Sequence, residues 1–343
     1  MLYLCQTIGS IGYYFCKGSS MGQYGDIKLF SGNGNLPLAE GVANYLGMEL
    51  CGRQIIEFPN ENLFVKLNRS VRGQDCYAIQ STSRPVNRNL MELLILLQTL
   101  YLDFAARLTA VVPYMCYARS DKKDQPRVPI TARLVADMIE VAGTNRYILM
   151  NLHAGQIQGF FKIPGDVLTA YHMLTDDMKQ KIAMKKVKDP VVVSADLGFA
   201  KQARNIAEEL GIPLAFIEKR RSGNDANAKA LSVIGDVQGH DCFLCDDEVD
   251  TAGSMSNDIN LLIESGATSV HTYFVHPVFS GPAVDRLTST KATQFTTTDS
   301  IEVPEKDFKR FDGRLNIISV ASLLGEVISR VNRGVSVGSL FHE

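Results

Sequence analysis

The sequence predicts an α/β protein with two tandem domains, each built on a mainly parallel sheet flanked by helices. The chain has 343 residues, which is more than one small hydrophobic core requires. Short apolar runs rich in β-branched residues alternate with helical patterns along almost the whole chain. Strands that alternate with helices form parallel sheets that are covered on both faces.

The expected elements follow from local apolar patterns. A first strand at 26–30 precedes a helix in which Leu38, Val42 and Leu46 share one face, and Gly47 ends that helix. The further expected strands are 108–114, 146–151, 190–195, 213–217, 241–245 and 269–275. The further expected helices are 89–105, 131–142, 200–210, 254–265 and 319–332. The helix at 89–105 is apolar nearly all round, so it should be buried on most sides, and we favour a subunit or domain contact for it.

Composition argues against several classes of protein. The net charge of −2 provides no general basic field for nucleic acid or for a membrane surface. No apolar run reaches the roughly 18 residues that a membrane-spanning helix needs. The seven cysteines are scattered, mostly among apolar neighbours, which favours reduced and buried thiols. We therefore expect a cytoplasmic protein with no nucleic-acid partner and no membrane partner.

Two local features need separate interpretations. Cys242 and Cys245 form a C-x-x-C pattern, but residues three apart on a strand point to opposite faces, so these thiols should not share a metal. Residues 1–23 fit the pattern of the rest poorly. We interpret them as an N-terminal extension or as a start assigned too early, and we consider a degenerate signal peptide less favoured because a basic start and a clear cleavage site are missing.

A cluster of acids and small residues follows the expected strand at 241–245. Asp246 and Asp247 come at the end of this strand, and ligands of open parallel sheets bind beyond the carboxyl ends of the strands. The next helix should begin near Ser254, with Asp258 in its first turn. A helix N-terminus offers free N–H groups to a phosphate.

The residue types in this loop describe a sugar phosphate. Gly253 lets the backbone approach a ligand closely, and Thr251 and Ser254 add hydroxyl donors. Carboxylates repel phosphate but accept hydrogen bonds from adjacent hydroxyls, so Asp246 and Asp247 suit a ribose diol. The alternative is a helix cap with a solvated acidic loop, which we consider less favoured for this combination of residues.

The loop resembles the phosphoribosyl-pyrophosphate (PRPP) binding loop shared by type I phosphoribosyltransferases and ribose-phosphate pyrophosphokinases. Other segments are similar to the pyrophosphokinases, also called PRPP synthetases: SVRGQD (70–75), NLMELLILL (89–97), YARSDKKD (117–124), NLHAGQIQGFF (151–161), FSGPA (279–283) and SVGSLF (336–341). The resemblance runs from about residue 26 to the end in one register.

The resemblance implies both an architecture and a reaction. It implies two domains of type I phosphoribosyltransferase-like fold. Residues 24–168 with 330–343 would form the N-terminal domain, which contacts ATP and forms oligomers, and residues 169–329 would form the ribose-5-phosphate-binding domain. The implied reaction transfers the diphosphoryl group of ATP to O1 of ribose 5-phosphate with Mg²⁺, giving PRPP and AMP. Hexameric members of the family are activated by phosphate and inhibited by ADP, so the partners implied are ATP, ribose 5-phosphate and further copies of the chain.

The resemblance also assigns residues, motif by motif. Lys219 and Arg221 match the catalytic pair on a mobile loop, where cations would neutralise the migrating phosphates as a ribose hydroxyl attacks in line. The matches to ATP contacts are Phe58, Asn60, Arg119, Ser120, Lys122, Lys123, Asp124 and His153. The matches to ribose 5-phosphate contacts are Asp196, Asp246, Asp247, Asp250, Thr251, Ala252, Gly253 and Ser254. His153 and Asp196 match the metal-binding residues, and a carboxylate together with phosphate oxygens and water suits Mg²⁺.

Several positions depart from the family pattern. Asn151 replaces an acid, Ser120 replaces a glutamine, and Asn62 replaces an acid near the adenine segment. Phe199 stands where the D-x-G-G loop has its second glycine, and Ser254 replaces a threonine. Two readings therefore compete: a divergent active enzyme, and a non-catalytic relative that binds nucleotide or ribose phosphate. A phosphoribosyltransferase that uses PRPP is a third. We favour the active enzyme because the charged groups are kept.

Overall fold

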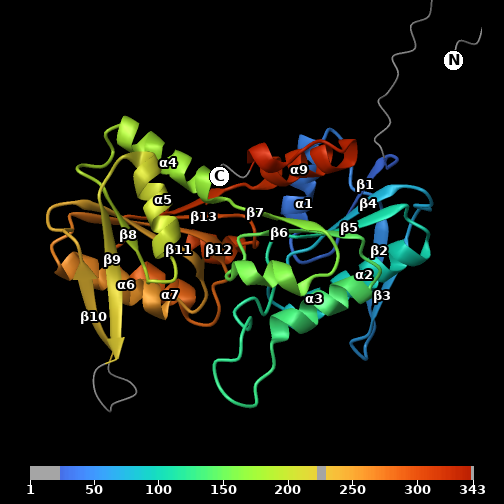
Figure 1. Cartoon of the computed structure of the whole chain (residues 1–343), viewed down its shortest axis with the longest axis horizontal. Coiled ribbons are helices and arrows are strands. Elements are labelled where there is room, and N and C mark those ends of the chain that lie inside the picture. Colours follow the sequence, from blue (N-terminus) through green and yellow to red (C-terminus); the bar gives the residue numbers. More distant parts are fainter. Residues whose placement is uncertain (1–23, 222–228, 341–343) are drawn as a thin grey trace, which may run out of the picture.

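The computed structural model describes residues 24–221 and 229–340, and its side chains are described except at 219–231. Two lobes lie side by side, with the first half of the chain in one lobe and most of the second half in the other (Figure 1). Among the described residues, no helix has both the length and the apolar character needed to cross a membrane.

The N-terminal lobe contains a five-stranded sheet in the order β1-β4-β5-β6-β7, and every neighbouring pair is parallel. Its strands are β1 (Ile27–Ser31), β4 (Asp75–Ile79), β5 (Arg107–Val112), β6 (Arg146–Met150) and β7 (Gly165–Leu168). Its helices are α1 (Leu36–Tyr45), α2 (Val86–Leu102), α3 (Thr131–Val141) and the 3₁₀ turn η1 (Gly155–Phe160). An antiparallel hairpin of β2 (Arg53–Glu57) and β3 (Leu63–Leu67) projects from this lobe.

The C-terminal lobe contains a seven-stranded sheet in the order β10-β9-β8-β11-β12-β13-β14, which is parallel except for the β9–β10 pair. Its strands are β8 (Val191–Ser194), β9 (Leu214–Arg221), β10 (Lys229–Ile234), β11 (Asp241–Val249), β12 (Ser269–Pro277), β13 (Gln294–Thr298) and β14 (Leu315–Ile318). The helices of the second half are α4 (Tyr171–Ala183), α5 (Ala200–Leu210), α6 (Gly253–Glu264), α7 (Ala283–Ser289), α8 (Glu305–Lys309), α9 (Ala321–Arg333) and the turn η2 (Gly338–Leu340). The predicted α/β class with parallel sheets is therefore confirmed.

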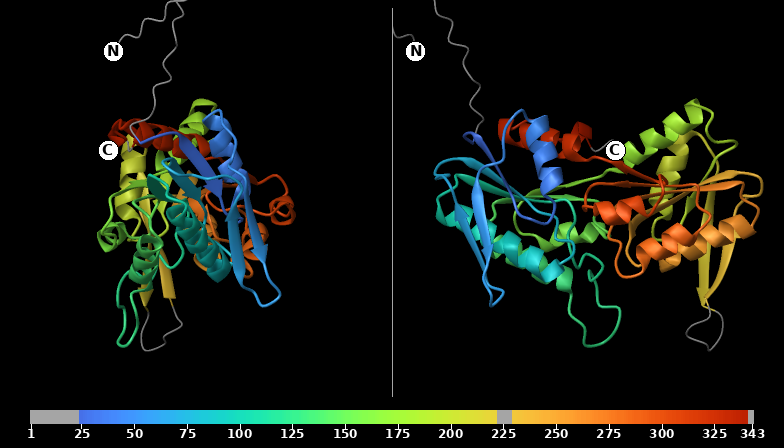
Figure 2. Two further views of the ribbon diagram at one scale, coloured as in Figure 1. Left: turned by 90° about the vertical axis from the view of Figure 1, so that its right-hand side faces the viewer. Right: turned by 180° about the vertical axis from the view of Figure 1, so that it is seen from behind.

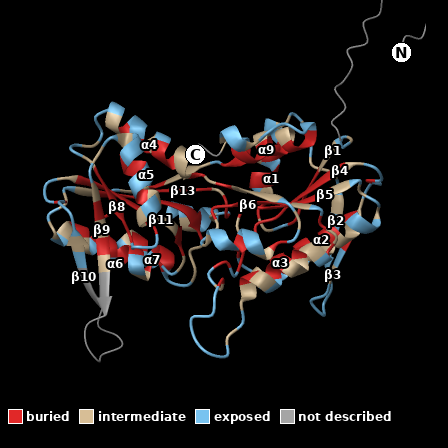
Figure 3. Cartoon of the chain, viewed as in Figure 1, coloured by how far each residue is buried: buried red, intermediate tan, exposed pale blue. Residues whose placement is uncertain are grey.

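The central strands are buried on both faces, as parallel sheets require (Figure 3). In β11, Phe243 and Cys245 pack in the apolar core on one face, while Cys242 and Leu244 pack in the core on the other face. The two thiols of the C-x-x-C pattern therefore point to opposite faces, which confirms the expectation that they cannot share a metal.

The C-terminal helix α9 returns to the N-terminal lobe and packs against α1, as the two further views show (Figure 2). Leu324, Val327 and Ile328 of α9 share one buried cluster with Leu38 and Val42 of α1. The same cluster continues under α4 and α5, so one apolar layer extends across both lobes. The domain limits at 168/169 and 329/330 stay predictions. The second limit falls within α9 (Ala321–Arg333), the helix that packs against α1 of the N-terminal lobe.

Helix α2 is buried along one side within a single chain, and the expected subunit contact on its other side stays a prediction. Leu93, Leu97 and Leu100 face the core of the N-terminal lobe, but Met91 and Leu102 remain exposed. The helix is therefore buried along one side only, and its other side presents apolar residues to solvent.

Helix α6 begins at Gly253, one residue earlier than expected. Asp258 is consequently in the second turn of the helix, not the first, and it is completely buried.

Candidate functional site

The candidate site lies between the lobes, where polar side chains extend from the carboxyl ends of the strands. Strand β8 pairs with β11 only as far as Cys245, whereas β12 pairs with β11 up to Val249. Asp246 and Asp247 therefore lie on β11 just beyond the end of β8, which leaves the backbone edge on that side free of a neighbouring strand. Across the cleft, His153 follows β6 of the N-terminal lobe, and its Nδ1 lies 2.5 Å from Oδ2 of Asp247.

The pKa values of the neighbouring acids Asp246 and Asp247 are shifted in opposite directions. Burial and the neighbouring charge of Asp247 raise the pKa of Asp246 well above its ordinary range. Burial would also raise the pKa of Asp247, but the hydrogen bond and charge of His153 outweigh it, so that pKa is lowered. The hydrogen bond in which the Asp247 carboxylate accepts from Nδ1 in turn raises the pKa of His153. The two pKa values are thus shifted in opposite directions, upward at Asp246 and downward at Asp247, and the carboxyl oxygens of both can accept hydrogen bonds from a polyol.

The loop at 250–254 has the geometry of an anion site at a helix N-terminus. Ala252 is the N-cap of α6, with a φ of 59° in the left-handed region, and no side chain caps the helix. The first N–H groups of α6 are therefore open to a ligand. Arg286 of α7 donates to the carbonyl of Thr251 at 2.9 Å and would lie 3.4 Å from a Cβ added at Gly253. The sequence patterns gave no signal for this arginine, because it is 35 residues from the carbonyl that it holds.

Arg119 reaches from the N-terminal lobe into the same loop. Its Nη1 lies 3.2 Å from Oδ2 of Asp250, and its Nε pairs with Glu248. Ser120, the next residue, contacts Thr131 at the start of α3 through its hydroxyl, at 3.3 Å from Oγ1. Ser120 therefore has a local role in holding the start of that helix, while Arg119 makes the contact between the lobes.

The remaining predicted ATP contacts are not all gathered at the cleft. Lys122, Lys123 and Asp124 lie on the exposed loop before α3. Phe58 and Asn60 lie at the tip of the β2–β3 hairpin, on the side of the N-terminal lobe away from the C-terminal lobe (Figures 1 and 2). One chain therefore does not place the predicted adenine segment beside His153 and Arg119.

Asn151 is occupied by a structural role. Its Oδ1 accepts from the backbone N–H of Ala170 at 2.8 Å, and its Nδ2 donates to Thr169 at 3.3 Å. The side chain thus holds the segment that leads from β7 to α4, and it is only 7% exposed. The amide that replaces the family's acid therefore makes hydrogen bonds within the chain.

Phe199 also has a structural explanation. Its φ of −87° is ordinary for any residue, and its N–H donates to Oδ1 of Asp196 at 2.9 Å. Its ring packs in the core with its centroid 5.3 Å from that of Tyr171. The side chain that replaces the second glycine therefore points into the core, and the backbone of the loop stays accessible beside the exposed Asp196.

The predicted catalytic pair lies on a strand in this structure. The backbone of β9 extends to Arg221, and Lys219 pairs with Leu231 of β10 in antiparallel register. The strand is longer than the expected 213–217 because β10 supplies hydrogen bonds along it. The side chains of Lys219 and Arg221 lie outside the described residues, as do residues 222–228.

His276 is a second histidine between the lobes that sequence reasoning missed. Its Nε2 lies 3.2 Å from the carbonyl oxygen of Asn151, and its Nδ1 lies 2.9 Å from Oγ of Ser300. A carbonyl can only accept, so Nε2 carries the proton. Burial lowers the pKa of His276 from an ordinary value of 6.5 to about 4.

The lowered pKa of His276 predicts a loss of stability in acid. Below pH 6.5 the unfolded chain takes up a proton on His276 that the folded chain takes up only near pH 4. The free energy of unfolding should therefore fall by up to about 1.4 kcal/mol per pH unit between these values. Urea unfolding of the wild type and of His276→Asn across this range measures the effect, and an equal slope in the two proteins would contradict it.

Comparisons with known proteins agree with this geometry. A family model described as the N-terminal domain of ribose phosphate pyrophosphokinase matches residues 27–143, and a phosphoribosyl transferase domain model matches residues 169–313. The chain is 42% identical over 315 residues to the ribose-phosphate pyrophosphokinase of Aquifex aeolicus, covering 92% of this chain and 99% of that relative. It is 44% identical over 315 residues to the enzyme of Rhizobium meliloti, covering 92% of this chain and all of that relative.

A solved structure is similar over nearly the same span. The phosphoribosylpyrophosphate synthetase of Mycobacterium smegmatis superposes with a TM-score of 0.84 at 39% sequence identity. The match covers 90% of this chain and 99% of that chain. The similarity therefore includes both lobes and their arrangement.

Proposed function

The chain belongs to the ribose-phosphate pyrophosphokinase family, and from this we propose that its cleft transfers the diphosphoryl group of ATP to O1 of ribose 5-phosphate, giving PRPP and AMP. The observation that carries the proposal is the contact between the two halves of the site. His153 and Arg119, from the predicted nucleotide side, touch Asp247 and Asp250 of the predicted sugar-phosphate loop. A reaction between two substrates needs both held against each other, which is what this contact supports.

The residues divide the work between binding and charge neutralisation. The open N-terminus of α6 would hold the 5-phosphate, and Asp246 and Asp247 would hold the ribose diol. O1 of the ribose then attacks the β-phosphorus in line, the new O1–P bond forms, and the bond from the β-phosphorus to the AMP oxygen breaks. The proton of the O1 hydroxyl leaves to solvent. Lys219 and Arg221 would neutralise the charge that shifts between the phosphates.

A magnesium ion fits the donor set. Among the described residues, no group of three or more acids, histidines or cysteines is arranged to hold a metal. Mg²⁺ commonly binds through one or two protein ligands together with substrate phosphates and water, so a full protein cage is unnecessary. Asp196, whose side chain is exposed at its loop, and His153 are the residues that we propose would contact the ion, which would supply charge neutralisation to the phosphates.

Formation of AMP and PRPP by the purified protein tests the function directly. With Mg²⁺-ATP and ribose 5-phosphate at saturation, we expect equal amounts of the two products. No AMP above the background without ribose 5-phosphate would overturn the proposal. The two substitutions that supported a non-catalytic relative, Asn151 and Phe199, both have structural roles in the fold.

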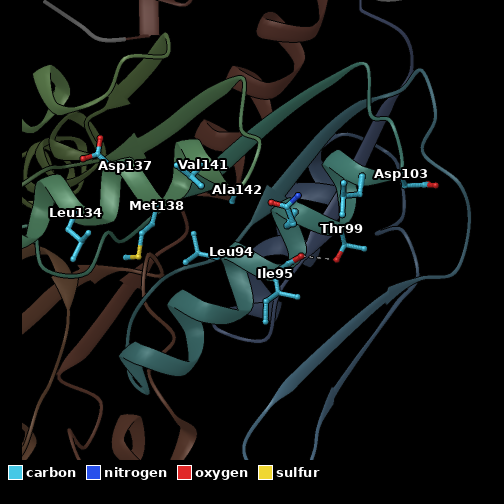
Figure 4. A pocket seen from close by; sticks show the side chains of 11 residues that line it. Leu94, Ile95, Thr99, Asp103, Leu134, Asp137, Met138, Val141 and Ala142 are labelled. Carbon is cyan, nitrogen blue, oxygen red and sulfur yellow. Dashed lines mark hydrogen bonds between the residues drawn. The ribbon is translucent and has the colours of Figure 1, made fainter.

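The exposed side of α2 supports assembly into a homo-oligomer, a hexamer by family resemblance. A groove of about 820 Å³ runs between α2 and α3 (Figure 4). Leu94, Ile95, Leu134 and Met138 line it, and Val141 at its rim is 82% exposed. An apolar surface of this kind is rarely left to solvent, and we propose that a second copy of the chain covers it.

A charge in this groove should weaken the assembly. We expect Val141→Glu to reduce the mass measured by light scattering after size-exclusion chromatography, because a buried, unpaired carboxylate opposes association. Met184→Glu is the matched control, since Met184 is an exposed apolar residue of the other lobe and should leave the mass unchanged. An unchanged mass for Val141→Glu would place the contact elsewhere.

A cytoplasmic location is the last part of the proposal. The five described cysteines, Cys51, Cys76, Cys116, Cys242 and Cys245, are all free thiols. Free thiols are typical of proteins in a reducing compartment, which supports the cytoplasm.

A further inference from the structure

Glu248 is a buried carboxylate in the cleft that the mechanism above does not use. It lies on β11 between the predicted diol acid Asp247 and the phosphate-loop acid Asp250, and only 6% of its surface is exposed. Its N–H donates to Oδ1 of Asp247 at 2.8 Å, which fixes its backbone. Its carboxylate pairs with Nε of Arg119 from the opposite lobe.

The carboxylate needs this arginine. Burial raises the pKa of Glu248, and the positive charge of Arg119 opposes that rise. A buried carboxylate is costly unless a cation and hydrogen bonds satisfy it. An apolar residue would be easier to bury at position 248. The chain instead has a carboxylate there, which pairs with an arginine 129 positions earlier in the sequence.

The arginine, in contrast, keeps part of its surface for a ligand. Its side chain is 50% exposed, although Nε contacts Glu248 and Nη1 contacts Asp250. A guanidinium has five N–H donors in a rigid plane, so an anchor on one edge fixes the direction of the remaining donors. The predicted role of Arg119 is to contact ATP, and a group that already points in the right direction loses less entropy on binding.

We propose that Glu248 is a positioning residue, which holds the Arg119 guanidinium across the cleft so that its remaining donors meet the phosphates of ATP. The inference rests on the proposed function. It adds that a residue beside the ribose 5-phosphate loop orients the arginine of the opposite lobe. The lobe that binds the sugar phosphate would therefore help to position a group that binds ATP. Glu248 itself does not touch substrate.

The test replaces the charge and keeps the shape. Calorimetry of Mg²⁺-ATP binding to Glu248→Gln should show affinity about tenfold weaker than for the wild type. In steady-state kinetics KM for ATP should rise about tenfold, while kcat changes by less than about threefold. Glu326→Gln is the matched control, because Glu326 also accepts from an arginine Nε, that of Arg330 at 2.6 Å, but on α9. This control should bind ATP like the wild type.

Two further variants separate positioning from structure. In an Arg119→Gln background, Glu248→Gln should cause no further loss of ATP affinity, because the group that it positions is gone. Glu248→Asp keeps the charge and should lose less affinity than Glu248→Gln. Unchanged or tighter ATP binding by Glu248→Gln, an additive loss in the Arg119→Gln background, or equal losses for the Asp and Gln variants would each overturn the proposal.

The binding measurement is independent of turnover. If the wild type makes no AMP, the proposed function fails, but the ATP affinities of the Glu248 and Arg119 variants still decide whether Glu248 positions Arg119. If AMP forms and the affinities do not change, the enzyme assignment stands and the positioning role falls.

Discussion

Replacement of Lys219 by alanine should lower kcat on the order of a thousandfold while changing KM for either substrate by less than about threefold. As the O1–P bond forms and the bond to AMP breaks, negative charge moves from the attacking O1 to the leaving oxygen of AMP and is shared by the transferring phosphoryl oxygens. A cation that meets this charge in the transition state stabilises it more than it stabilises bound substrate, so its loss appears in kcat.

The position of Lys219 makes the effect separable from folding. Its backbone lies on β9 near the outer end of the β9–β10 pair, and β9 is the second strand from the edge of the sheet. Alanine there should leave the core intact, and thermal unfolding checks this. Lys309→Ala is a suitable control, because Lys309 pairs with Glu305 on the exposed helix α8. A change confined to KM would mean that Lys219 contributes to binding only, and that the catalytic cation is another residue.

The fold class could be predicted because its signals are local. Alternating apolar runs and helical patterns predict parallel strands with helical crossovers, and the sheets have this arrangement. The hairpin at 53–67 was missed because its apolar runs are short, two residues at 55–56 and three at 63–65. The extension of β9 to Arg221 was missed because pairing with β10 determines it, not the residues of β9 alone.

The candidate site also has a part that the local sequence predicts and a part that it does not. The loop at 246–254 could be predicted because acids, small residues and a helix start follow one another in the sequence. The contacts that give these residues their properties could not. Glu248 and Arg119 are far apart in sequence, and so are His276 and Asn151. A partner of this kind has no local pattern, because the arrangement of the two lobes alone brings it into contact.

The two substitutions near the phosphate loops illustrate the limit of reasoning from a motif. Asparagine at position 151 suggested a lost metal ligand, yet the amide is bonded to the segment leading into α4. Phenylalanine at position 199 suggested a blocked loop, yet its ring fills the core beside Tyr171. In both cases the direction of the side chain decides the consequence, and the direction depends on neighbours that the motif does not include.

Asp247→Asn should raise KM for ribose 5-phosphate about a hundredfold, because a charged acceptor for the sugar hydroxyls becomes a neutral amide. The substitution also replaces the charged acceptor that raises the pKa of His153 with a neutral one. The pKa of His153 should therefore fall toward its ordinary value, which NMR titration of its ring protons measures without any turnover.

Asp246→Asn provides the comparison that tests the division of roles within the pair. Burial and the charge of Asp247 raise the pKa of Asp246, which favours its neutral form. The neutral carboxylic acid and the neutral amide of asparagine carry the same charge. Asparagine at 246 should therefore cost less ribose 5-phosphate affinity than asparagine at 247, and it should leave His153 with a raised pKa. Equal losses from the two substitutions would show that both acids bind the diol as carboxylates.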